Sequence, residues 1–345
     1  MKTIFVTGGT GYVGSHTAVT LLEHGYEVVI LDNLSNSQFG VLEKIYKISG
    51  FSPTFYEGDI RNRALLSKIF TDHSISGVIH FAGLKAVGES QSKPLEYYDN
   101  NVVGSITLVE EMLKAKVDTF IFSSSATVYG EASTTQYEES MPTIPINVYG
   151  RTKLIVEELL RDAAKANTHL KISCLRYFNP VGAHSSGLIG ENPVGIPNNL
   201  LPYIGKIAMG MLPTLKVFGN DYPTPDGTGL RDYIHVDDLA LGHVLALEYL
   251  EHNPGVLTVN LGTGKPYSVL EIIAAFEKVS HKKIPYDVVE RRSGDLAEYY
   301  ANPNLAKILL GWHAKHGIER ICEDTWRFYS QLGPQNSSIT STQNG

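Results

Sequence analysis

Three glycines, Gly8, Gly11 and Gly14, constrain the fold of this chain most strongly, because they separate a strand pattern from a helical pattern. Residues 4–6 are apolar and precede the glycines, and residues 13–22 carry apolar side chains at helical spacing. A strand, a tight glycine turn and a helix start form the context of a dinucleotide-binding fingerprint. Gly8 allows the turn, Gly11 lets backbone N–H groups approach a pyrophosphate, and Gly14 lets the helix pack closely on the strand. The helix N-terminus then presents free N–H groups and the positive end of its dipole to phosphates.

Asp32 strengthens this interpretation, because the spacing Gly-x-x-Gly-x-x-Gly is only a modest signal by itself. Asp32 ends the apolar run 28–31 and lies 18 residues after Gly14. A second parallel strand at this point delivers a carboxylate to the ribose hydroxyls of the dinucleotide. The carboxylate repels a 2′-phosphate, so the sequence favours NAD over NADP. The alternative is an aspartate that only caps the turn after its strand.

The composition excludes several classes of function. At 345 residues the chain is long enough for two domains, and 43% hydrophobic residues supply an ordinary globular core. A net charge of −7 leaves no electrostatic footprint for nucleic acid. Cys174 and Cys322 match no metal or redox spacing, so we predict no metal site and two reduced thiols. The first apolar run is too short for a signal peptide, and no stretch approaches the ~18 apolar residues of a membrane helix. We expect a cytoplasmic protein without a membrane interaction, with a disordered polar tail over 331–345.

Strand and helix patterns alternate along the first half of the chain. Strands are predicted at 28–32, 54–57, 77–83 with its turn, 119–122 and 171–177, and helices at 61–70, 94–116 and 149–165. This alternation predicts an α/β fold with a Rossmann-type, doubly wound parallel sheet that binds ligands beyond the carboxyl ends of its strands.

The second half has a different texture. Pro and Gly crowd residues 192–228, which predicts loops and short elements that cover the cleft, and a helix at 237–250, a strand at 257–259 and a helix at 269–280 follow. We predict an NAD-binding Rossmann domain over 1–180 with a return segment at 232–262. A smaller, mixed α/β substrate-binding domain is expected over 181–330.

Tyr149 and Lys153 carry the chemistry that the sequence predicts. Four residues apart at a helix start, they share one face and lie about 6 Å apart along the axis. A phenol with a pKa near 10 is a poor base, but a neighbouring ammonium lowers the pKa of the phenol. Tyr149 then removes a hydroxyl proton, Ser125 hydrogen-bonds the same hydroxyl, and Lys153 can bond the nicotinamide ribose. Such a pair also occurs by chance on exposed helix faces, and a strand-end turn is the alternative for the serine cluster, above all for Ser124.

Longer motifs carry a far more specific resemblance. They are Phe-Ala-Gly-Leu-Lys-Ala-Val-Gly-Glu-Ser at 81–90, Tyr-Tyr-Asp-Asn-Asn at 97–101, Ser-Ser-Ser-Ala-Thr-Val-Tyr-Gly at 123–130, Arg-Tyr-Phe-Asn-Pro-Val-Gly-Ala at 176–183 and Arg-Asp-Tyr-Ile-His-Val at 231–236. With the features above, they make residues 2–330 resemble the UDP-glucose (UDP-galactose) 4-epimerases of the extended short-chain dehydrogenase/reductase family. Val148 replaces the usual Pro, Thr152 replaces a common Ser, and the connection from Ser125 to Tyr149 is one residue short. None of these departures removes a functional group.

The resemblance implies a complete cofactor site. Catalysis is assigned to Tyr149, Lys153 and Ser125, which also contact NAD. The adenosine half of NAD would be lined by Tyr12, Val13, Asp32, Asn33, Asn36 and Ser37, with Asp59 and Ile60 beside the adenine. The pyrophosphate and riboses would be held by Phe81, Ala82, Gly83, Lys85 and Asn100, with Tyr177 and Phe178 near the nicotinamide.

The resemblance also implies a UDP-hexose site. Its members would be Asn179, Asn199, Leu200, Lys216, Phe218, Arg231, Arg292 and Asp295. A guanidinium fork matches diphosphate oxygens, which suits Arg231 and Arg292. Tyr299 would limit the volume of the hexose pocket, so poor activity on UDP-N-acetylhexosamines is expected.

The implied reaction oxidises the sugar transiently at C4. Tyr149 takes the C4 hydroxyl proton while hydride passes to NAD, the 4-keto sugar turns about its diphosphate, and hydride returns to the opposite face. One alternative is a nucleotide-sugar 4,6-dehydratase, whose Asp-Glu pair is replaced here by Ala126 and Thr127. Another is a non-catalytic NAD-binding regulator. The predicted helices at 94–116 and 149–165 would pair in a homodimer.

Overall fold

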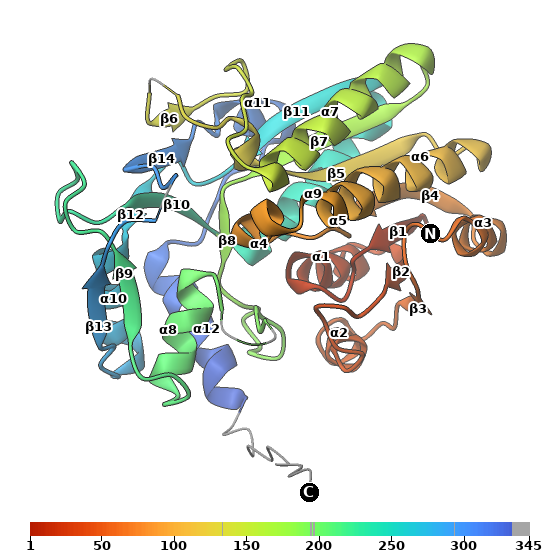
Figure 1. The fold of residues 1–345 in the computed structure, drawn as a ribbon. Coiled ribbons are helices and arrows are strands. Elements are labelled where there is room, and N and C mark those ends of the chain that lie inside the picture. The colour runs from red at the N-terminus through yellow and green to blue at the C-terminus, as the bar shows by residue number, and fades with distance from the viewer. Residues whose placement is uncertain (133, 194, 196, 293, 333–345) are drawn as a thin grey trace, which may run out of the picture.

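The computed structural model describes residues 1–132, 134–193, 195, 197–292 and 294–332. A seven-stranded sheet in the order β11-β7-β5-β4-β1-β2-β3 forms the centre of the larger lobe (Figure 1). All its neighbouring strands pair in parallel: β1 (Thr3–Thr7), β2 (Glu27–Asp32), β3 (Thr54–Glu57), β4 (Ile75–His80), β5 (Thr119–Ser125), β7 (Lys171–Tyr177) and β11 (Gly255–Leu261). The strand order reverses between β1 and β4, where ligands bind in sheets of this kind. The predicted fold class is confirmed.

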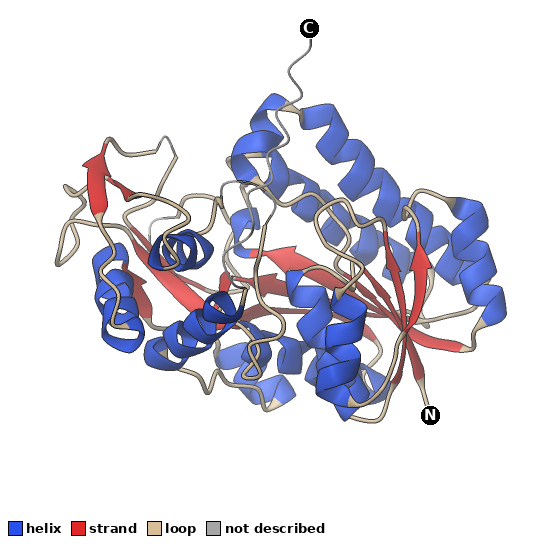
Figure 2. Cartoon of the chain, turned by 90° about the horizontal axis from the view of Figure 1, so that it is seen from below, coloured by secondary structure: helices blue, strands red, loops and turns tan. Residues whose placement is uncertain are grey.

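Helices cover both faces of this sheet (Figure 2). One face is covered by α1 (Tyr12–Glu23), α2 (Val41–Ser49), α9 (Val236–His252) and α11 (Asn304–Leu310), and the other by α3 (Arg63–Asp72), α6 (Gly104–Lys114) and α7 (Val148–Ala166). Alternation along each strand supplies both cores. In β1, Ile4 and Val6 pack into the first core and Phe5 into the second. The long apolar strands are therefore buried on both faces, as in other parallel sheets.

The predicted helix over 94–116 is interrupted. It consists of α5 (Pro94–Tyr97), a π-helix (Tyr98–Val103) and α6, and a short helix α4 (Val87–Ser92) precedes it. The side chain of Asn101, within the π-helical turn, is buried and reaches back to Leu84 in the loop after β4. A π turn inserts an extra residue and is frequent at functional sites. Apolar spacing does not reveal such an insertion, because helical periodicity continues on either side.

The smaller lobe contains two further sheets. The first has the order β12-β10-β14-β6, and β8 also pairs with β10. Its strands are β6 (Gln136–Tyr137), β8 (Asn179–Val181), β10 (Leu230–His235), β12 (Pro266–Ser268) and β14 (Glu298–Ala301). The second pairs β9 (Leu215–Phe218) with β13 (Tyr286–Val289). The helices here are α8 (Leu200–Ala208), α10 (Val269–Ser280) and α12 (Ile318–Gln331). The region 192–228, predicted as loops and short elements, contains α8 and β9.

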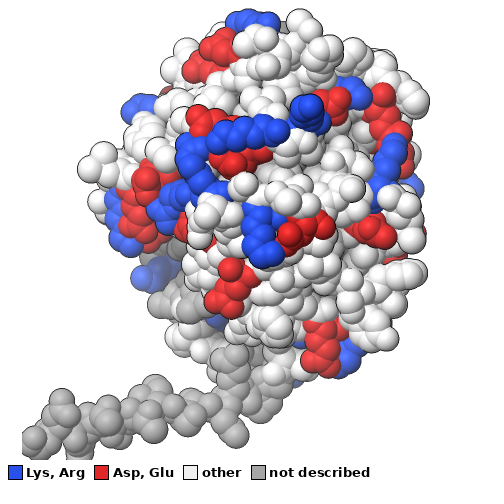
Figure 3. All heavy atoms as spheres, turned by 90° about the vertical axis from the view of Figure 1, so that its right-hand side faces the viewer, with Lys and Arg blue, Asp and Glu red and all other residues white. Residues whose placement is uncertain are grey.

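The chain returns to the large lobe after β10. Helix α9 packs against α1, and β11 pairs with β7 at the edge of the large sheet. Gln331 is the last residue of α12, one residue into the predicted tail, and residues 333–345 lie outside the described part of the chain. Within the described ranges, no helix is both long and apolar enough to cross a membrane. On the face shown in Figure 3, basic and acidic side chains are interspersed.

Candidate active site

The turn between β1 and α1 has the form of a phosphate-binding turn. Gly8 has a φ of +71°, and a Cβ there would lie 2.7 Å from the backbone nitrogen of Ala82. A Cβ on Gly14 would lie 2.2 Å from the Gly8 carbonyl oxygen, so α1 can pack this closely only on glycine. Gly11 is the N-cap of α1, which has neither a side-chain cap nor an acidic residue in its first turn. These residues fit a dinucleotide pyrophosphate at the helix N-terminus.

Asp32 caps the turn after β2, as the alternative interpretation predicts. Its carboxylate is also suited to bind a dinucleotide ribose. Its Oδ1 accepts hydrogen bonds from the backbone N–H of Leu34 at 2.9 Å and from Ser37 Oγ at 3.3 Å. Its Oδ2 accepts one from the backbone N–H of Thr10 at 3.1 Å, within the glycine turn. Asp32 thus links the turn after β2 to the turn after β1. The half-buried carboxylate lies at the sheet edge where a dinucleotide ribose would bind.

The other predicted cofactor residues lie in the turns that follow β1, β2, β3 and β4 or in neighbouring elements. Tyr12 and Val13 begin α1, Asn33 and Asn36 are exposed after β2, and Asp59 follows β3 and pairs with Arg61. Phe81 packs its ring 4.8 Å from that of His243 on α9. The remaining members are Ile60 after β3, Ala82, Gly83 and Lys85 after β4, Asn100 in the π-helix, Tyr177 ending β7 and Phe178 directly after it.

The serine cluster ends strand β5 rather than forming a turn, and its side chains alternate. Ser124 is buried, and its hydroxyl donates a hydrogen bond of 2.5 Å to Glu157 Oε1 on α7. Ser125 is half-buried, and its Oγ accepts hydrogen bonds from the backbone N–H and the hydroxyl of Thr127. Successive strand residues point to opposite faces. Ser124 is therefore structural, whereas Ser125, the predicted site residue, lies on the opposite face of the strand.

The start of α7 places Tyr149 and Lys153. Asn147 caps the helix by accepting a 2.8 Å hydrogen bond from the backbone N–H of Gly150, so the helix begins at Val148 without the usual proline. Thr152 donates from its hydroxyl to the Tyr149 carbonyl at 2.7 Å. The buried Lys153 Nζ lies 5.8 Å from the centroid of the Tyr149 ring. The two departures at 148 and 152 thus leave this local geometry intact.

The pKa of Tyr149 does not follow the expectation from the sequence. Burial raises the pKa of Tyr149 to about 12, although the Ser125 hydroxyl acts in the opposite direction. Burial also lowers the pKa of Lys153 to about 8. Lys153 Nζ donates a 2.7 Å hydrogen bond to the carbonyl of Ser123. The prediction that the Lys153 ammonium lowers the pKa of Tyr149 was therefore wrong for this structure: Lys153 is not among the groups that shift this pKa, and desolvation of the phenolate raises it.

Tyr299 lies between the predicted base Tyr149 and the residues predicted for the sugar nucleotide. Its ring stacks on Phe178, with centroids 5.3 Å apart and an interplanar angle of 28°. The Arg231 guanidinium carbon lies 5.5 Å from the centroid of the same ring. Tyr299 is also close enough to contribute to the raised pKa of Tyr149. Residues from α7, β10 and β14 thus converge at one place.

The remaining residues predicted for the UDP site occupy two regions of the small lobe. Arg231 Nη2 lies 3.7 Å from Asp295 Oδ1, and Asn179 Nδ2 donates to the backbone carbonyl of Asp232 at 2.9 Å. Arg292 lies over the Phe218 ring, with its guanidinium carbon 3.8 Å from the centroid. Three further members complete the set: Lys216, exposed on β9, Asn199, the N-cap of α8, and Leu200, its first residue.

Sequence reasoning missed two buried residues beside the site, Asn101 and Glu191. Asn101 Oδ1 accepts from the backbone N–H of Leu84 at 2.8 Å, and its Nδ2 donates to Thr152 Oγ1 at 3.1 Å. Asn101 thus joins the loop after β4 to α7. The only sequence signal for Asn101 was its place in the motif at 97–101. No sequence motif near Glu191 indicated a functional residue. No cluster of potential metal ligands occurs among the described residues.

The chain is similar to known proteins along most of its length. Residues 4–262 match the NAD dependent epimerase/dehydratase family. The chain is 55% identical over 331 residues to UDP-glucose 4-epimerase of Neisseria meningitidis serogroup C, covering 96% of this chain and 98% of the relative. It is 57% identical over 326 residues to UDP-glucose 4-epimerase of Pasteurella multocida, covering 94% and 96%.

Solved structures also match this chain along nearly its whole length. UDP-glucose 4-epimerase of Stenotrophomonas maltophila with bound NAD and formylated UDP-arabinopyranose superposes with a TM-score of 0.94 at 50% identity, covering 96% of this chain and 99% of that one. The enzyme of Bifidobacterium longum in complex with NAD+ and UDP gives a TM-score of 0.93 at 48% identity, covering 96% and 98%. The resemblance stated from the sequence is confirmed.

Proposed function

Because this chain belongs to the NAD dependent epimerase/dehydratase family, we propose that it interconverts UDP-glucose and UDP-galactose by inverting the configuration at C4 with bound NAD. One structural observation carries the proposal: the predicted base Tyr149 lies beside both Ser125 and Tyr299, and Arg231 lies over the Tyr299 ring. A proton acceptor, a hydroxyl donor and a cation suited to a diphosphate therefore converge beside the carboxyl end of β5.

The residues of this chain supply the acid–base chemistry and the binding. Tyr149 removes the C4 hydroxyl proton as the C4–H bond breaks and C4 becomes a carbonyl, and it returns the proton when the carbonyl is reduced. Ser125 hydrogen-bonds the same oxygen, and Lys153 holds positive charge beside the phenol. Bound NAD supplies the hydride acceptor and, on the opposite face of the sugar, the hydride donor.

The uridine diphosphate half of the substrate anchors the sugar between the two half-reactions. The guanidinium groups of Arg231 and Arg292 suit diphosphate oxygens. Binding energy concentrated on this non-reacting part lets the hexose turn while the nucleotide stays in place. Tyr299, stacked on Phe178, would limit the space for the hexose, so UDP-N-acetylhexosamines would fit poorly.

The two rival functions lack support in the site. A 4,6-dehydratase needs an additional acid–base pair, but Ala126 is buried and the Thr127 hydroxyl bonds to Ser125 Oγ. A non-catalytic regulator has no need of a tyrosine, lysine and serine that converge. Both rivals share the fold, so the fold alone does not separate them from an epimerase.

We also propose that the protein acts as a homodimer through the face formed by α5, the π-helix, α6 and α7. Leu95 on α5 is 81% exposed, and Val103 at the end of the π-helix is 46% exposed. Exposed apolar side chains of this size mark interaction surfaces when they gather on one face.

An assay with UDP-galactose tests the proposed function. Purified protein is expected to form UDP-glucose without net consumption of NAD, and NAD(H) is expected to co-purify. Accumulation of a 4-keto-6-deoxy sugar would show a dehydratase instead. Tight NAD binding with no conversion of UDP-galactose would show a regulator.

A further inference from the structure

Glu191 lies in the connection between β8 and α8 and is only 7% exposed. Its Oε1 accepts a hydrogen bond from Lys85 Nζ at 2.9 Å and another from Asn199 Nδ2 at 2.7 Å. Lys85 follows β4 of the large sheet, whereas Asn199 is the N-cap of α8 in the small lobe. A single carboxylate oxygen therefore joins the two lobes.

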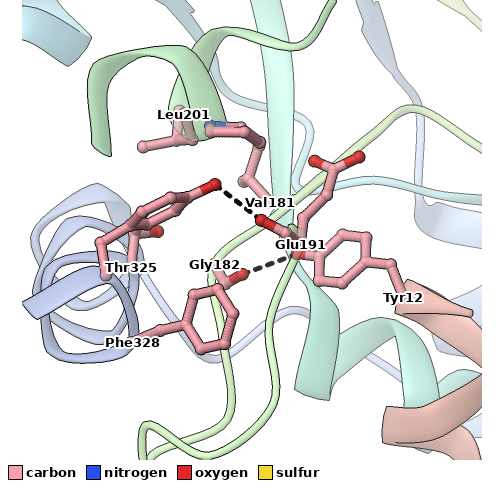
Figure 4. A pocket seen from close by; sticks show the side chains of 9 residues that line it. Tyr12, Val181, Gly182, Glu191, Leu201, Thr325 and Phe328 are labelled. Atoms are coloured by element: carbon pink, nitrogen blue, oxygen red, sulfur yellow. Dashed lines mark hydrogen bonds between the residues drawn. The ribbon is translucent and has the colours of Figure 1, made fainter. Parts of the chain in front are cut away.

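The backbone around Glu191 is held firmly in place. Its carbonyl accepts a 2.7 Å hydrogen bond from the buried hydroxyl of Tyr329 on α12. The Tyr12 hydroxyl donates a 2.8 Å bond to the nearby Gly182 carbonyl, and both bonds border the small cavity of Figure 4. In this view the Glu191 side chain turns away from Phe328. The charge of Glu191 is close enough to add to the effect of burial in raising the pKa of Tyr12. The carboxylate thus lies beside the first residue of α1.

Stability alone does not account for this carboxylate. Its second oxygen, Glu191 Oε2, is buried and has no hydrogen-bond partner among the described residues. Burying an incompletely paired carboxylate costs free energy of folding. Such costs persist where the group serves the function of a site rather than its stability.

We propose that Glu191 is a positioning residue that couples the NAD site to the UDP site. This inference rests on the proposed function, which assigns Lys85 to the cofactor and Asn199 to the nucleotide of the substrate. Lysine has a long side chain that loses much rotamer freedom when it is fixed. Glu191 binds both Lys85 and Asn199. When NAD orders Lys85, the Glu191 carboxylate and therefore Asn199 become ordered as well, and UDP bound to Asn199 has the same effect on Lys85. The second ligand then binds to a site that is already ordered.

The rate of NAD release measures the coupling between the NAD site and the UDP site without catalytic turnover. NAD release from the holoenzyme is followed with and without saturating UDP, for the wild type, Glu191→Gln and the control Glu111→Gln. Glu111 on α6 is 6% exposed and contacts the cations Arg63 on α3 and Lys114 on α6, so it matches Glu191 in burial and charge. UDP is expected to slow NAD release about 10-fold or more in the wild type and control, and less than about twofold in Glu191→Gln.

Steady-state kinetics add a second readout. For Glu191→Gln the KM for UDP-galactose is expected to rise about 5- to 30-fold with kcat within about threefold, because the reacting groups are untouched. Lys85→Met removes the other partner from an exposed position and is expected to abolish the same effect of UDP on NAD release, even if Glu191→Gln fails to fold. Wild-type coupling in Glu191→Gln, or an equal loss in Glu111→Gln, would overturn the proposal. Absence of epimerisation with intact coupling would instead reject only the proposed function.

Discussion

Lys153 donates a 2.7 Å hydrogen bond from its buried ammonium to the backbone carbonyl of Ser123. This bond ties α7 to the end of β5, the two elements that carry Tyr149 and Ser125. It also satisfies one donor of an ammonium that burial would otherwise leave without water. Lys153 thus joins α7 to β5 through this hydrogen bond. In the proposed chemistry it also places a positive charge near the Tyr149 phenol.

The buried ammonium of Lys153 should make stability depend on pH. The pKa of Lys153 is about 8 in the folded protein against 10.5 for an ordinary lysine. Below pH 8 the group is charged in both states, and the full cost of burying it is present. Between pH 8 and 10.5 the unfolded state binds more protons, so stability rises with pH. Relative to Lys153→Met, the free energy of unfolding of the wild type should rise by up to about 3 kcal/mol between pH 8 and pH 10.5.

Urea unfolding at pH 7 and at pH 10.5 measures this rise in the free energy of unfolding. Lys165→Met, at a highly exposed site, is the control. Parallel pH profiles for wild type and Lys153→Met would contradict the prediction.

Tyr149→Phe should retain NAD but lose kcat for UDP-galactose by about 10²–10⁴-fold, the usual contribution of a positioned base. The change removes only the phenolic oxygen, so folding should be unaffected. Initial rates and the absorbance of bound cofactor test both statements. Tyr46→Phe, at a half-exposed position on α2, should behave as the wild type. A rate near that of the wild type for Tyr149→Phe would mean that another group is the base.

Glu157→Gln should destabilise the protein by about 3–5 kcal/mol, because it leaves a buried guanidinium without its counter-charge. Glu157 is fully buried and accepts hydrogen bonds of 2.9 Å and 2.7 Å from Arg176. Chemical denaturation gives the free energy of unfolding. Its neighbour Glu158 is exposed on α7, and Glu158→Gln should change this free energy by less than about 0.5 kcal/mol. Similar losses in both variants would show that the Arg176 pair contributes little.

Tyr299 should restrict the sugar. Wild-type protein is expected to turn over UDP-N-acetylglucosamine poorly, with kcat/KM at least about 10-fold below that for UDP-glucose. Tyr299→Ala should narrow this difference, since it removes the ring that stacks on Phe178. Both substrates are assayed by separating the epimers. Substantial turnover of UDP-N-acetylglucosamine by the wild type would refute the assigned role.

Leu95→Glu should convert the proposed homodimer to a monomer, because it replaces an apolar side chain on α5 that is 81% exposed by a charged one. Ile308→Glu makes the same change at a 75% exposed position on α11 and should leave the dimer intact. Sedimentation velocity compares the three proteins. A monomeric wild type would disprove the dimer itself.

Much of the large lobe could be predicted because its signals are local. The strands at 54–57 and 171–177 have the predicted bounds, and the glycine turn adopts the backbone that its three glycines indicated. In the small lobe, helix α10 also has the predicted bounds, 269–280, but the sheets of that lobe could not be predicted in this way. Strand β6 has only two residues, and its partner β14 lies more than 150 residues later. Strands this short show no periodicity, and pairing over such a distance leaves no local mark.

The sequence by itself determined the parallel sheet, the dinucleotide turn and the Tyr149–Lys153 pair, because each depends on residues close together in the chain. Only the tertiary structure decided that Ser125 rather than Ser124 is available to the site, and that Glu191 joins Lys85 to Asn199. It also decided that the pKa of Tyr149 is raised rather than lowered. The physical reason is burial: desolvation and contacts between distant segments arise only when the chain has folded, and no spacing of residues encodes them directly.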